Sequence, residues 1–277
     1  MKRCGSGYVL TLVLAVLLFL VLGVGPVSAG PISLWIGNDL NPALPVLQTD
    51  LSGTVLRTVS GVDSIGFAVS YQAGLIYFND GFSITPMNLA TLSAGTPLLA
   101  PGMLDMTFDG TYIWAADPFN SSLDAINPAD GSTVTTIDLG YQPLGVTWTG
   151  NGFWVSENGD FVTGIWGTPV RRYTAAGVFT GQMFTPWPAV FDAQGGLVDP
   201  GRTPGGLAFA QGTLWIGDTD GWVRHYSTAG VPLAGDFTTG DGRYVGGLEA
   251  QIPEPSTALL LGGGLLALLA AWRRRAS

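Results

Sequence analysis

The sequence is poor in the side chains on which many enzymes depend. Its 277 residues include one cysteine and one histidine. Cys4 lies in an N-terminal segment that we expect to be removed, so the mature chain has no thiol for a disulfide or a metal cluster. His225 alone cannot build a histidine-rich metal site. Neither a Gly-x-Ser-x-Gly elbow nor a phosphate-binding loop occurs, so we expect no metal, no cofactor and no catalytic residues.

Lysine is almost absent, and the charge of the chain is strongly acidic. The one lysine is Lys2, and residues 30–252 contain six arginines and 19 acidic residues, a formal charge of −13. A surface with this charge repels phosphate backbones, which argues against a nucleic-acid partner. The same surface suits cations, or solubility outside the cell.

The N-terminus has the pattern of a secretory signal peptide. Two basic residues precede an apolar run over residues 8–24, and Pro26 ends that run. Small residues follow at once, which predicts export through the Sec machinery and cleavage by signal peptidase between Ala29 and Gly30. Residues 1–29 are therefore the predicted signal peptide, whose apolar run forms a signal helix. An uncleaved membrane anchor is the alternative, and the cleavable site directly after Pro26 disfavours it.

The C-terminus has three parts: a Pro-Glu-Pro-Ser motif, an apolar stretch and an arginine cluster. The apolar stretch, Ala258 to Trp272, has 15 residues. A helix of that length reaches about 22 Å, whereas the hydrocarbon core of a bilayer is about 30 Å thick. The predicted short transmembrane helix is thus a weak anchor, and the positive-inside rule keeps the arginines cytoplasmic. The motif and the cluster consist of Pro253, Glu254, Pro255, Ser256, Arg273, Arg274 and Arg275.

This tail, residues 252–277, resembles the PEP-CTERM sorting signal of Gram-negative bacteria. The resemblance implies recognition by a membrane-embedded exosortase, with the chain held transiently at the inner membrane through residues 258–272. It also implies removal of the tail and delivery to the cell envelope or the extracellular matrix. It says nothing about the cargo, because different domains carry this tail. A plain single-span anchor is the alternative.

A repeat fills the region between the two ends, residues 30–251. Five similar segments place an aromatic residue in a short apolar strand, at spacings of 42, 37, 40 and 61 residues. The first three spacings match the period of β-propeller blades, and Asn-Gly and Asp-Gly pairs supply hairpin turns. The repeated aromatic residues are Trp35, Tyr77, Trp114, Trp154 and Trp215.

We therefore predict an all-β fold, a β-propeller of five four-stranded blades. The segment 244–250 repeats the first strand of the unit, and the N-terminal copy lacks that strand, so pairing between them closes the ring. Extra residues at 185–203 enlarge the fourth blade. An open β-sandwich is the alternative, but it does not predict a circularly permuted repeat. The repeats also resemble the NHL and YVTN families of β-propellers, which implies a fold and not a function.

A polar residue follows each repeated aromatic by three positions and begins a loop on one rim of the predicted propeller. These residues either bind a cation or a sugar or, as their strict period favours, cap their own turns. Trp166 and Trp187, in the enlarged fourth blade, are less repetitive and are candidates for stacking on a sugar. The repeated polar residues are Asn38, Asp80, Asp117, Glu157 and Asp218.

For the function we expect a non-enzymatic propeller, exported to the cell envelope or matrix, that binds a glycan, a protein or a cation. The alternative is a glycoside hydrolase or lyase that acts on extracellular polysaccharide. A glycosidase needs two facing carboxylates, and Glu157 with a rim aspartate is the pair that the sequence offers.

Overall fold

The computed structural model describes residues 32–38, 41, 43–70, 73–159, 164 and 166–252. No helix among these residues has the length and apolar character needed to cross a bilayer. The predicted signal peptide with its cleavage site, the sorting motif and the apolar stretch at 258–272 lie outside the described residues. The body of the chain is one compact unit that runs from Ile32 to Ile252.

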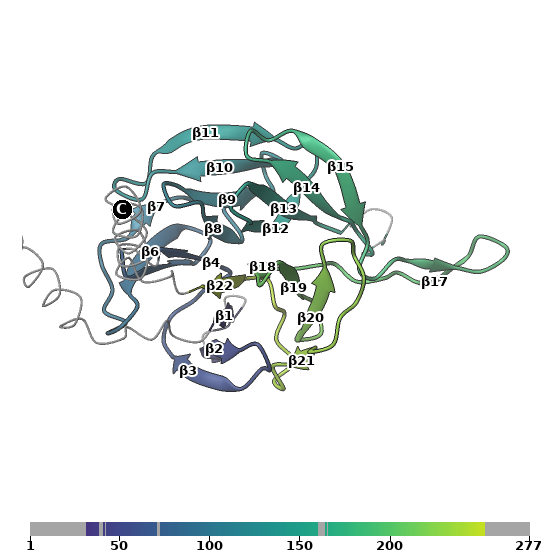
Figure 1. Ribbon diagram of the computed structural model, residues 1–277, viewed down its shortest axis with the longest axis horizontal. Coiled ribbons are helices and arrows are strands. Elements are labelled where there is room, and N and C mark those ends of the chain that lie inside the picture. The colour runs from purple at the N-terminus through teal and green to yellow at the C-terminus, as the bar shows by residue number, and fades with distance from the viewer. Residues whose placement is uncertain are drawn as a thin grey trace, which may run out of the picture. The chain divides into compact units, whose positions relative to one another are not determined.

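Five antiparallel sheets of four strands surround a common axis (Figure 1). Blade 1 contains, from the axis outward, β22 (Leu248–Gln251), β1 (Ser33–Ile36), β2 (Val46–Asp50) and β3 (Val55–Val59). Blade 2 contains β4 (Gly66–Ser70), β5 (Leu75–Asn79), β6 (Ser83–Asn88) and β7 (Leu98–Leu99). Blade 3 contains β8 (Met106–Phe108), β9 (Ile113–Asp117), β10 (Ser122–Ile126) and β11 (Thr133–Asp138).

The last two blades follow the same plan. Blade 4 contains β12 (Pro143–Trp148), β13 (Gly152–Glu157), β14 (Val170–Thr174) and β15 (Phe179–Phe184). Blade 5 contains β18 (Leu207–Ala210), β19 (Thr213–Gly217), β20 (Trp222–Ser227) and β21 (Phe237–Thr238). The innermost strands β22, β4, β8, β12 and β18 contact one another in that order around the ring. The chain is thus a five-bladed β-propeller, which confirms the predicted fold class.

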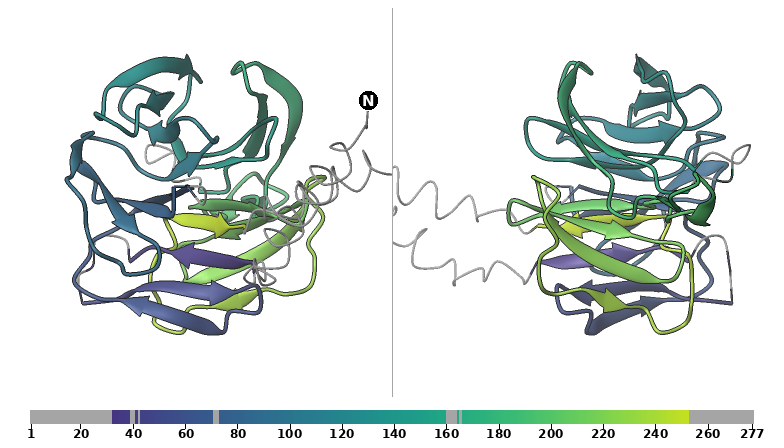
Figure 2. Two further views of the ribbon diagram at one scale, coloured as in Figure 1. Left: turned by 60° about the vertical axis from the view of Figure 1, so that its left-hand side comes forward. Right: turned by 90° about the vertical axis from the view of Figure 1, so that its right-hand side faces the viewer.

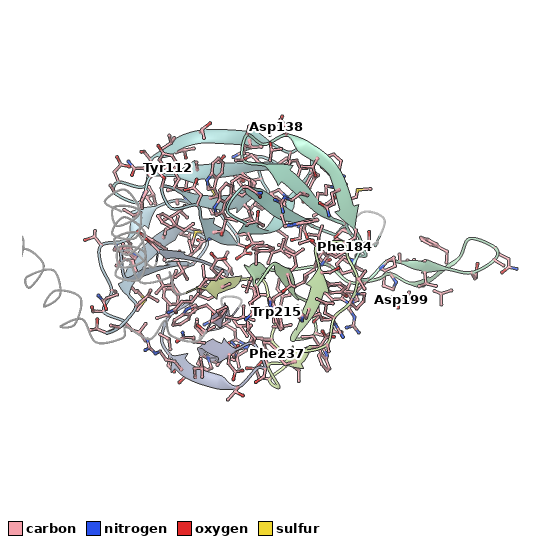
Figure 3. The ribbon with its side chains drawn as sticks, viewed as in Figure 1. Tyr112, Asp138, Phe184, Asp199, Trp215 and Phe237 are labelled. Atoms are coloured by element: carbon pink, nitrogen blue, oxygen red, sulfur yellow. The ribbon has the colours of Figure 1, made fainter. Side chains whose placement is uncertain are left out.

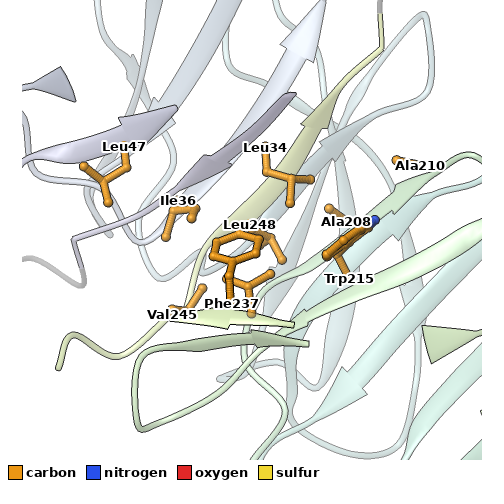
Figure 4. Packing of buried hydrophobic residues seen from close by; sticks show 10 residues of the cluster. Leu34, Ile36, Leu47, Ala208, Ala210, Trp215, Phe237, Val245 and Leu248 are labelled. Carbon is orange, nitrogen blue, oxygen red and sulfur yellow. The ribbon is translucent and has the colours of Figure 1, made fainter. Parts of the chain in front are cut away.

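The repeated aromatic residues form the packing between blades. All five are buried, and Trp35 and Trp154 are fully enclosed. Trp35 of blade 1 meets Phe78 of blade 2 edge to face, with ring centroids 6.2 Å apart. Between blades 5 and 1, Trp215 and Leu248 belong to one apolar cluster (Figure 4). One large aromatic residue in each blade therefore fills the space between neighbouring sheets, since such side chains bury the largest apolar area.

The C-terminal strand closes the ring, as predicted. β22 pairs with β1 in antiparallel register, from Ser33 opposite Gln251 to Ile36 opposite Leu248 (Figure 2). The Gln251 side chain secures the pair, because its Oε1 accepts hydrogen bonds from Trp35 Nε1 at 3.0 Å and from Gln48 Nε2 at 3.1 Å. The first and last strands of the described chain are therefore held in one sheet.

The closing strand begins at Leu248, four residues later than the predicted start at 244. The segment before it is bonded to blade 5 instead, because the N–H of Val245 donates to the carbonyl of Asp218 and its carbonyl accepts from Gly206, both at 3.0 Å, and the backbones approach closely here. A Cβ on Gly247 would lie 2.5 Å from the carbonyl oxygen of Ile65, and one on Gly206 would lie 2.4 Å from the nitrogen of Leu248. The buried Arg243 supports this passage by donating hydrogen bonds to the carbonyls of Gly37 and Pro45.

The extra residues at 185–203 lie in the connection between blades 4 and 5. They contain a short hairpin of β16 (Val190–Phe191) and β17 (Leu197–Asp199) that projects from the body (Figure 1). We call residues 185–203 the arm. Four apolar side chains on the hairpin are 44 to 66% exposed, namely Val190, Phe191, Leu197 and Val198.

Candidate functional site

Three of the predicted rim residues, Asp80, Asp117 and Asp218, hold the turns in which they lie. Each carboxylate accepts, at 2.9 Å, the backbone N–H of the residue two positions further along the chain. Asn38 acts across a longer loop, because its side-chain amide donates to the carbonyls of Leu44 and Val62. The side-chain atoms in these bonds therefore face the backbone of their own blade or of the connection to the next blade. Their role in ligand binding stays a prediction.

Glu157, the fifth rim residue, differs from the aspartates because it forms an ion pair. Its Oε2 accepts hydrogen bonds from Nη2 of Arg171 at 2.6 Å and from Nε at 3.1 Å. The guanidinium of Arg171 in turn lies 5.0 Å from the ring centroid of Tyr141. Among the described residues, no three histidine, cysteine, aspartate or glutamate side chains gather closely enough to hold a metal ion.

An open pocket of about 360 Å³ lies where the arm leaves the body, and Trp187 is in its wall. Figure 3 marks this place with Asp199, at the end of β17. Trp166 is a neighbour of the arm, because its backbone N–H donates to the carbonyl of Pro200 at 2.8 Å. The structure thus places both predicted tryptophans near the base of the arm, with Trp187 at the pocket. The lining residues are Pro186, Trp187, Pro188, Asp199, Gly201, Arg202 and Arg224.

Backbone contacts at the base of the arm fix the shape of the pocket. The N–H of Arg202 donates to the carbonyl of Trp187 at 3.3 Å, and the N–H of Gly167 donates to the carbonyl of Pro200 at 3.0 Å. Gly201 has a φ of +72°, and a Cβ on it would lie 2.4 Å from the carbonyl oxygen of Trp187. Only glycine meets both conditions without strain, so Gly201 lets the two sides of the arm approach each other.

The two arginines of the pocket are held by one buried carboxylate. The side chain of Asp218 is fully buried, and its Oδ2 lies 3.3 Å from Nη1 of Arg202 and 3.6 Å from Nε of Arg224. Nη2 of Arg202 lies 2.9 Å from Oδ2 of Asp220, and Nη1 of Arg224 lies 3.3 Å from Oδ2 of Asp236. Each guanidinium therefore faces two carboxylates, which orient it before any ligand arrives, although of the two at Arg224 only that of Asp236 is within hydrogen-bond distance.

Aromatic rings complete the surroundings of Arg224. Its guanidinium carbon lies 5.8 Å from the ring centroid of Trp187 and 4.8 Å from that of Trp222, both within the range of a cation–π contact. Trp187 also meets Tyr226 edge to face, with centroids 6.3 Å apart. The pocket thus combines a fixed indole ring with fixed hydrogen-bond donors and acceptors.

Sequence reasoning identified Asp218 and Trp187 but missed Arg202 and Arg224. Arg202 comes from the arm, and no repeated spacing connects it to Asp218, whereas Arg224 lies on β20, the strand that follows Asp218 in the same hairpin. One signal was available, because residues 30–252 contain only six arginines. Arg224 lies two positions after Trp222, so on a strand the two side chains share one face, where the arginine can contact the indole ring.

A second polar group that sequence reasoning missed lies at the axis of the ring. Asp105 is completely buried directly before β8. Its Oδ2 accepts backbone N–H groups from Val146 at 3.2 Å and Leu207 at 3.1 Å, and its Oδ1 accepts that of Leu248 at 3.4 Å. These donors belong to the innermost strands of blades 4, 5 and 1. One carboxylate of blade 3 therefore connects three other blades.

Glu249 of β22 lies beside this group and is also buried. Its Oε1 accepts a hydrogen bond from Oγ1 of Thr107 at 3.0 Å. A side chain of blade 1 is thus bonded to blade 3, just as the Asp105 side chain of blade 3 is bonded to blade 1. Burial raises the pKa of Asp105 well above its usual range. Burial, and then the charge of Asp105, raise the pKa of Glu249 in the same direction. Because both groups are closed to solvent, we regard them as structural.

Comparison with known proteins identifies the tail and the fold. The model of a family described as the PEP-CTERM protein-sorting motif matches residues 251–275. This match confirms the motif predicted from the Pro-Glu-Pro, apolar and arginine segments. No curated protein matches the chain in sequence.

Among solved structures, the chain is similar to one from a nidogen/laminin complex. The two share 12% identity at a TM-score of 0.55, over 81% of this chain and 100% of that chain. It is also similar to a glutaminyl cyclase from Myxococcus xanthus, at 12% identity and a TM-score of 0.43, over 67% of this chain and 69% of that chain. At such identities a likeness concerns the fold alone.

Proposed function

We propose that this exported, exosortase-sorted β-propeller is a non-enzymatic binding module of the cell envelope, and that its ligand is a glycan. The observation that carries the proposal is the pocket at the base of the arm. Trp187 offers an apolar ring, while Arg202 and Asp199 offer N–H donors and carboxylate oxygens at one opening. Sugars present both apolar C–H faces and hydroxyl groups, so this combination suits them. A volume of about 360 Å³ lies at the lower end of the range for small-molecule sites.

The contacts of the acidic residues favour binding over hydrolysis. A glycoside hydrolase needs two carboxylates that face the same bond of the substrate. Glu157, the glutamate considered for that role, has Oε2 occupied by Arg171. Of the residues that line the pocket, Asp199 alone has a carboxylate. The arrangement therefore supports a binding module rather than the hydrolase or lyase alternative.

Replacing Trp187 with alanine is expected to weaken glycan binding at least about tenfold, because central aromatic contacts contribute most of the affinity at such sites. The measurement uses the exported protein, expressed from the full-length chain, on a glycan array and then by calorimetry with the oligosaccharide found. The control is Phe119→Ala, which removes a side chain that is 82% exposed outside the pocket.

The melting temperature of each variant separates binding from stability, because Trp187 also packs on Tyr226. A folded Trp187→Ala variant with unchanged affinity would show that the glycan binds elsewhere. If the wild-type protein binds no glycan, or hydrolyses one at the rim with loss of turnover in Glu157→Gln, the proposal is wrong.

We also propose that the tail is a temporary tether, which is removed before the propeller reaches its final place in the envelope or matrix. The predicted helix is short, and the glycines at 262–264 weaken it further. We expect two cuts, one after Ala29 and one near Glu254, so that neither apolar end persists. Intact mass of the protein recovered from its native host measures this directly.

Two sets of substitutions test the parts of the tail separately. Changing Arg273, Arg274 and Arg275 to serine is expected to let the chain pass through the membrane uncut. Changing Glu254 to glutamine is expected to leave the chain bound to the membrane. A dominant wild-type species that still contains residues 258–277 would instead indicate a permanent anchor.

A further inference from the structure

The charges at the pocket are balanced within the protein itself. Arg202 is paired with Asp218 and Asp220, and Arg224 is paired with Asp218 and Asp236. Two positive groups thus face three carboxylates, before Asp199 in the lining is counted. The surrounding propeller adds to this imbalance, with 19 acidic residues against six arginines over residues 30–252. The arginines therefore provide hydrogen-bond donors without providing a net positive field.

An anionic ligand that replaced an aspartate at these arginines would have to displace a carboxylate that is already in place. Asp218 cannot be displaced at low cost, because its side chain is 0% exposed and would be left as a buried, unpaired charge. Its other oxygen is held as well, since Oδ1 accepts the N–H groups of Asp220 and Trp222 at 2.9 Å. The arginines thus stay with their aspartates when a ligand enters.

We propose that the pocket selects uncharged saccharides over anionic ones, and that Asp220 and Asp236 determine this specificity by neutralising Arg202 and Arg224. The inference rests on the proposed glycan function and specifies the class of glycan. A guanidinium has five N–H groups, so one that faces two carboxylates still has donors for hydroxyl oxygens. The carboxylate of Asp199, which lines the pocket, accepts hydrogen bonds from hydroxyl groups, and Trp187 contacts an apolar face of the sugar ring. A carboxylate-bearing sugar meets the same donors but is repelled by the aspartates.

The test compares matched pairs of sugars that differ in one charged group. Glucan, galactan and mannan oligosaccharides are immobilised beside their counterparts in which the C6 hydroxymethyl group is a carboxylate. Binding of the exported protein, expressed from the full-length chain, is measured at low and at physiological salt. We expect at least one neutral oligosaccharide to bind, and its carboxylate counterpart to bind at least about tenfold more weakly, equal to about 1.4 kcal/mol. The difference should shrink as salt rises, because salt screens the repulsion.

The double variant Asp220→Asn with Asp236→Asn tests the assignment to these residues. It leaves Asp218 in place, so the turn and the buried carboxylate are preserved. We expect its affinity for the carboxylate sugar to rise about tenfold, and its affinity for the neutral sugar to change less. The control is Asp130→Asn with Asp138→Asn, which changes the net charge equally but lies at β11 and the turn before it. This control should show little change.

Each outcome bears on one of three claims: the preference for uncharged sugars, its assignment to Asp220 and Asp236, and the glycan function. Binding of a carboxylate sugar as tightly as its neutral counterpart would overturn the inference while leaving the glycan function intact. An unchanged preference in the Asp220 and Asp236 variant would overturn the assignment to these residues. Failure of every sugar in both sets to bind would overturn the proposed function itself.

Discussion

A chain that ends after Gly247 is expected to be less stable to unfolding by at least about 4 kcal/mol than one that ends after Ile252. The shorter chain lacks β22, including Leu248, whose side chain is fully buried. Loss of one such leucine alone costs about 2–5 kcal/mol. Loss of the strand also removes the antiparallel partner of β1 and leaves its backbone groups unpaired. Urea unfolding followed by tryptophan fluorescence measures the difference.

The chain that ends after Ile252 is the matched control, because it lacks the tail but keeps every residue of β22. It should unfold as the processed protein does. Equal midpoints for the two chains would mean that pairing between β22 and β1 does not hold the ring closed. A difference in slope as well as midpoint would indicate that the shorter chain is already partly open before denaturant is added.

Replacing Asp105 with asparagine is expected to lower the free energy of unfolding by at least about 1–3 kcal/mol. At a pH where the Asp105 carboxyl is ionised, both of its oxygens accept, whereas the amide turns an N–H donor toward the backbone N–H groups of Val146, Leu207 or Leu248, and at least one of these loses its acceptor. Each buried donor left unsatisfied costs about 1–3 kcal/mol. Thermal and urea unfolding measure the loss, and Asp138→Asn on the outermost strand of blade 3 is the control. A loss below 1 kcal/mol would show that Asp105 does not connect the blades.

The same residue predicts an unusual dependence of stability on pH. Asp105 and Glu249 have pKa values raised above 3.8 and 4.5 by burial, so the folded chain holds protons that the unfolded chain releases. The stability that these two groups contribute is complete below pH 3.8 and 4.5 respectively. It is lost as the pH rises through their raised pKa values, by up to about 1.4 kcal/mol per pH unit for each group. We expect stability to fall as the pH rises above 3.8 and 4.5, with a shallower slope in Asp105→Asn.

The fold could be predicted from the sequence because its determinants repeat. Trp35, Trp154 and their equivalents recur once per blade, and each is buried between sheets. The order of the blades and the closing strand follow from that period together with the permuted copy at the C-terminus. The exact start of β22 could not be predicted, since it depends on backbone contacts of Gly247 with a loop far away in the sequence.

The candidate site was only half predictable, for a different physical reason. Asp218 could be identified because it occupies the polar position that recurs in every blade. Trp187 could be identified because it lies in the extra residues that interrupt the repeat. The role of Arg202 depends on its ion pair with Asp218, which requires the arm to pack on blade 5. The role of Arg224 depends on its ion pairs with Asp218 and Asp236 and on its contact with Trp187 of the arm. Asp105 carries no sequence signal at all, because its partners are backbone N–H groups, which every residue but proline possesses.

The turns held by Asp80 and Asp117 have a consequence for the evolution of this surface. Each carboxylate fixes the backbone two residues on, while the side chain at that position faces solvent; these are Phe82, 72% exposed, and Phe119, 82% exposed. Because the turn depends on the aspartate, the residue displayed on it can be exchanged with little effect on the fold. The rim is therefore a rigid frame with replaceable positions, and selection could diversify recognition there while leaving the buried rings of the propeller untouched.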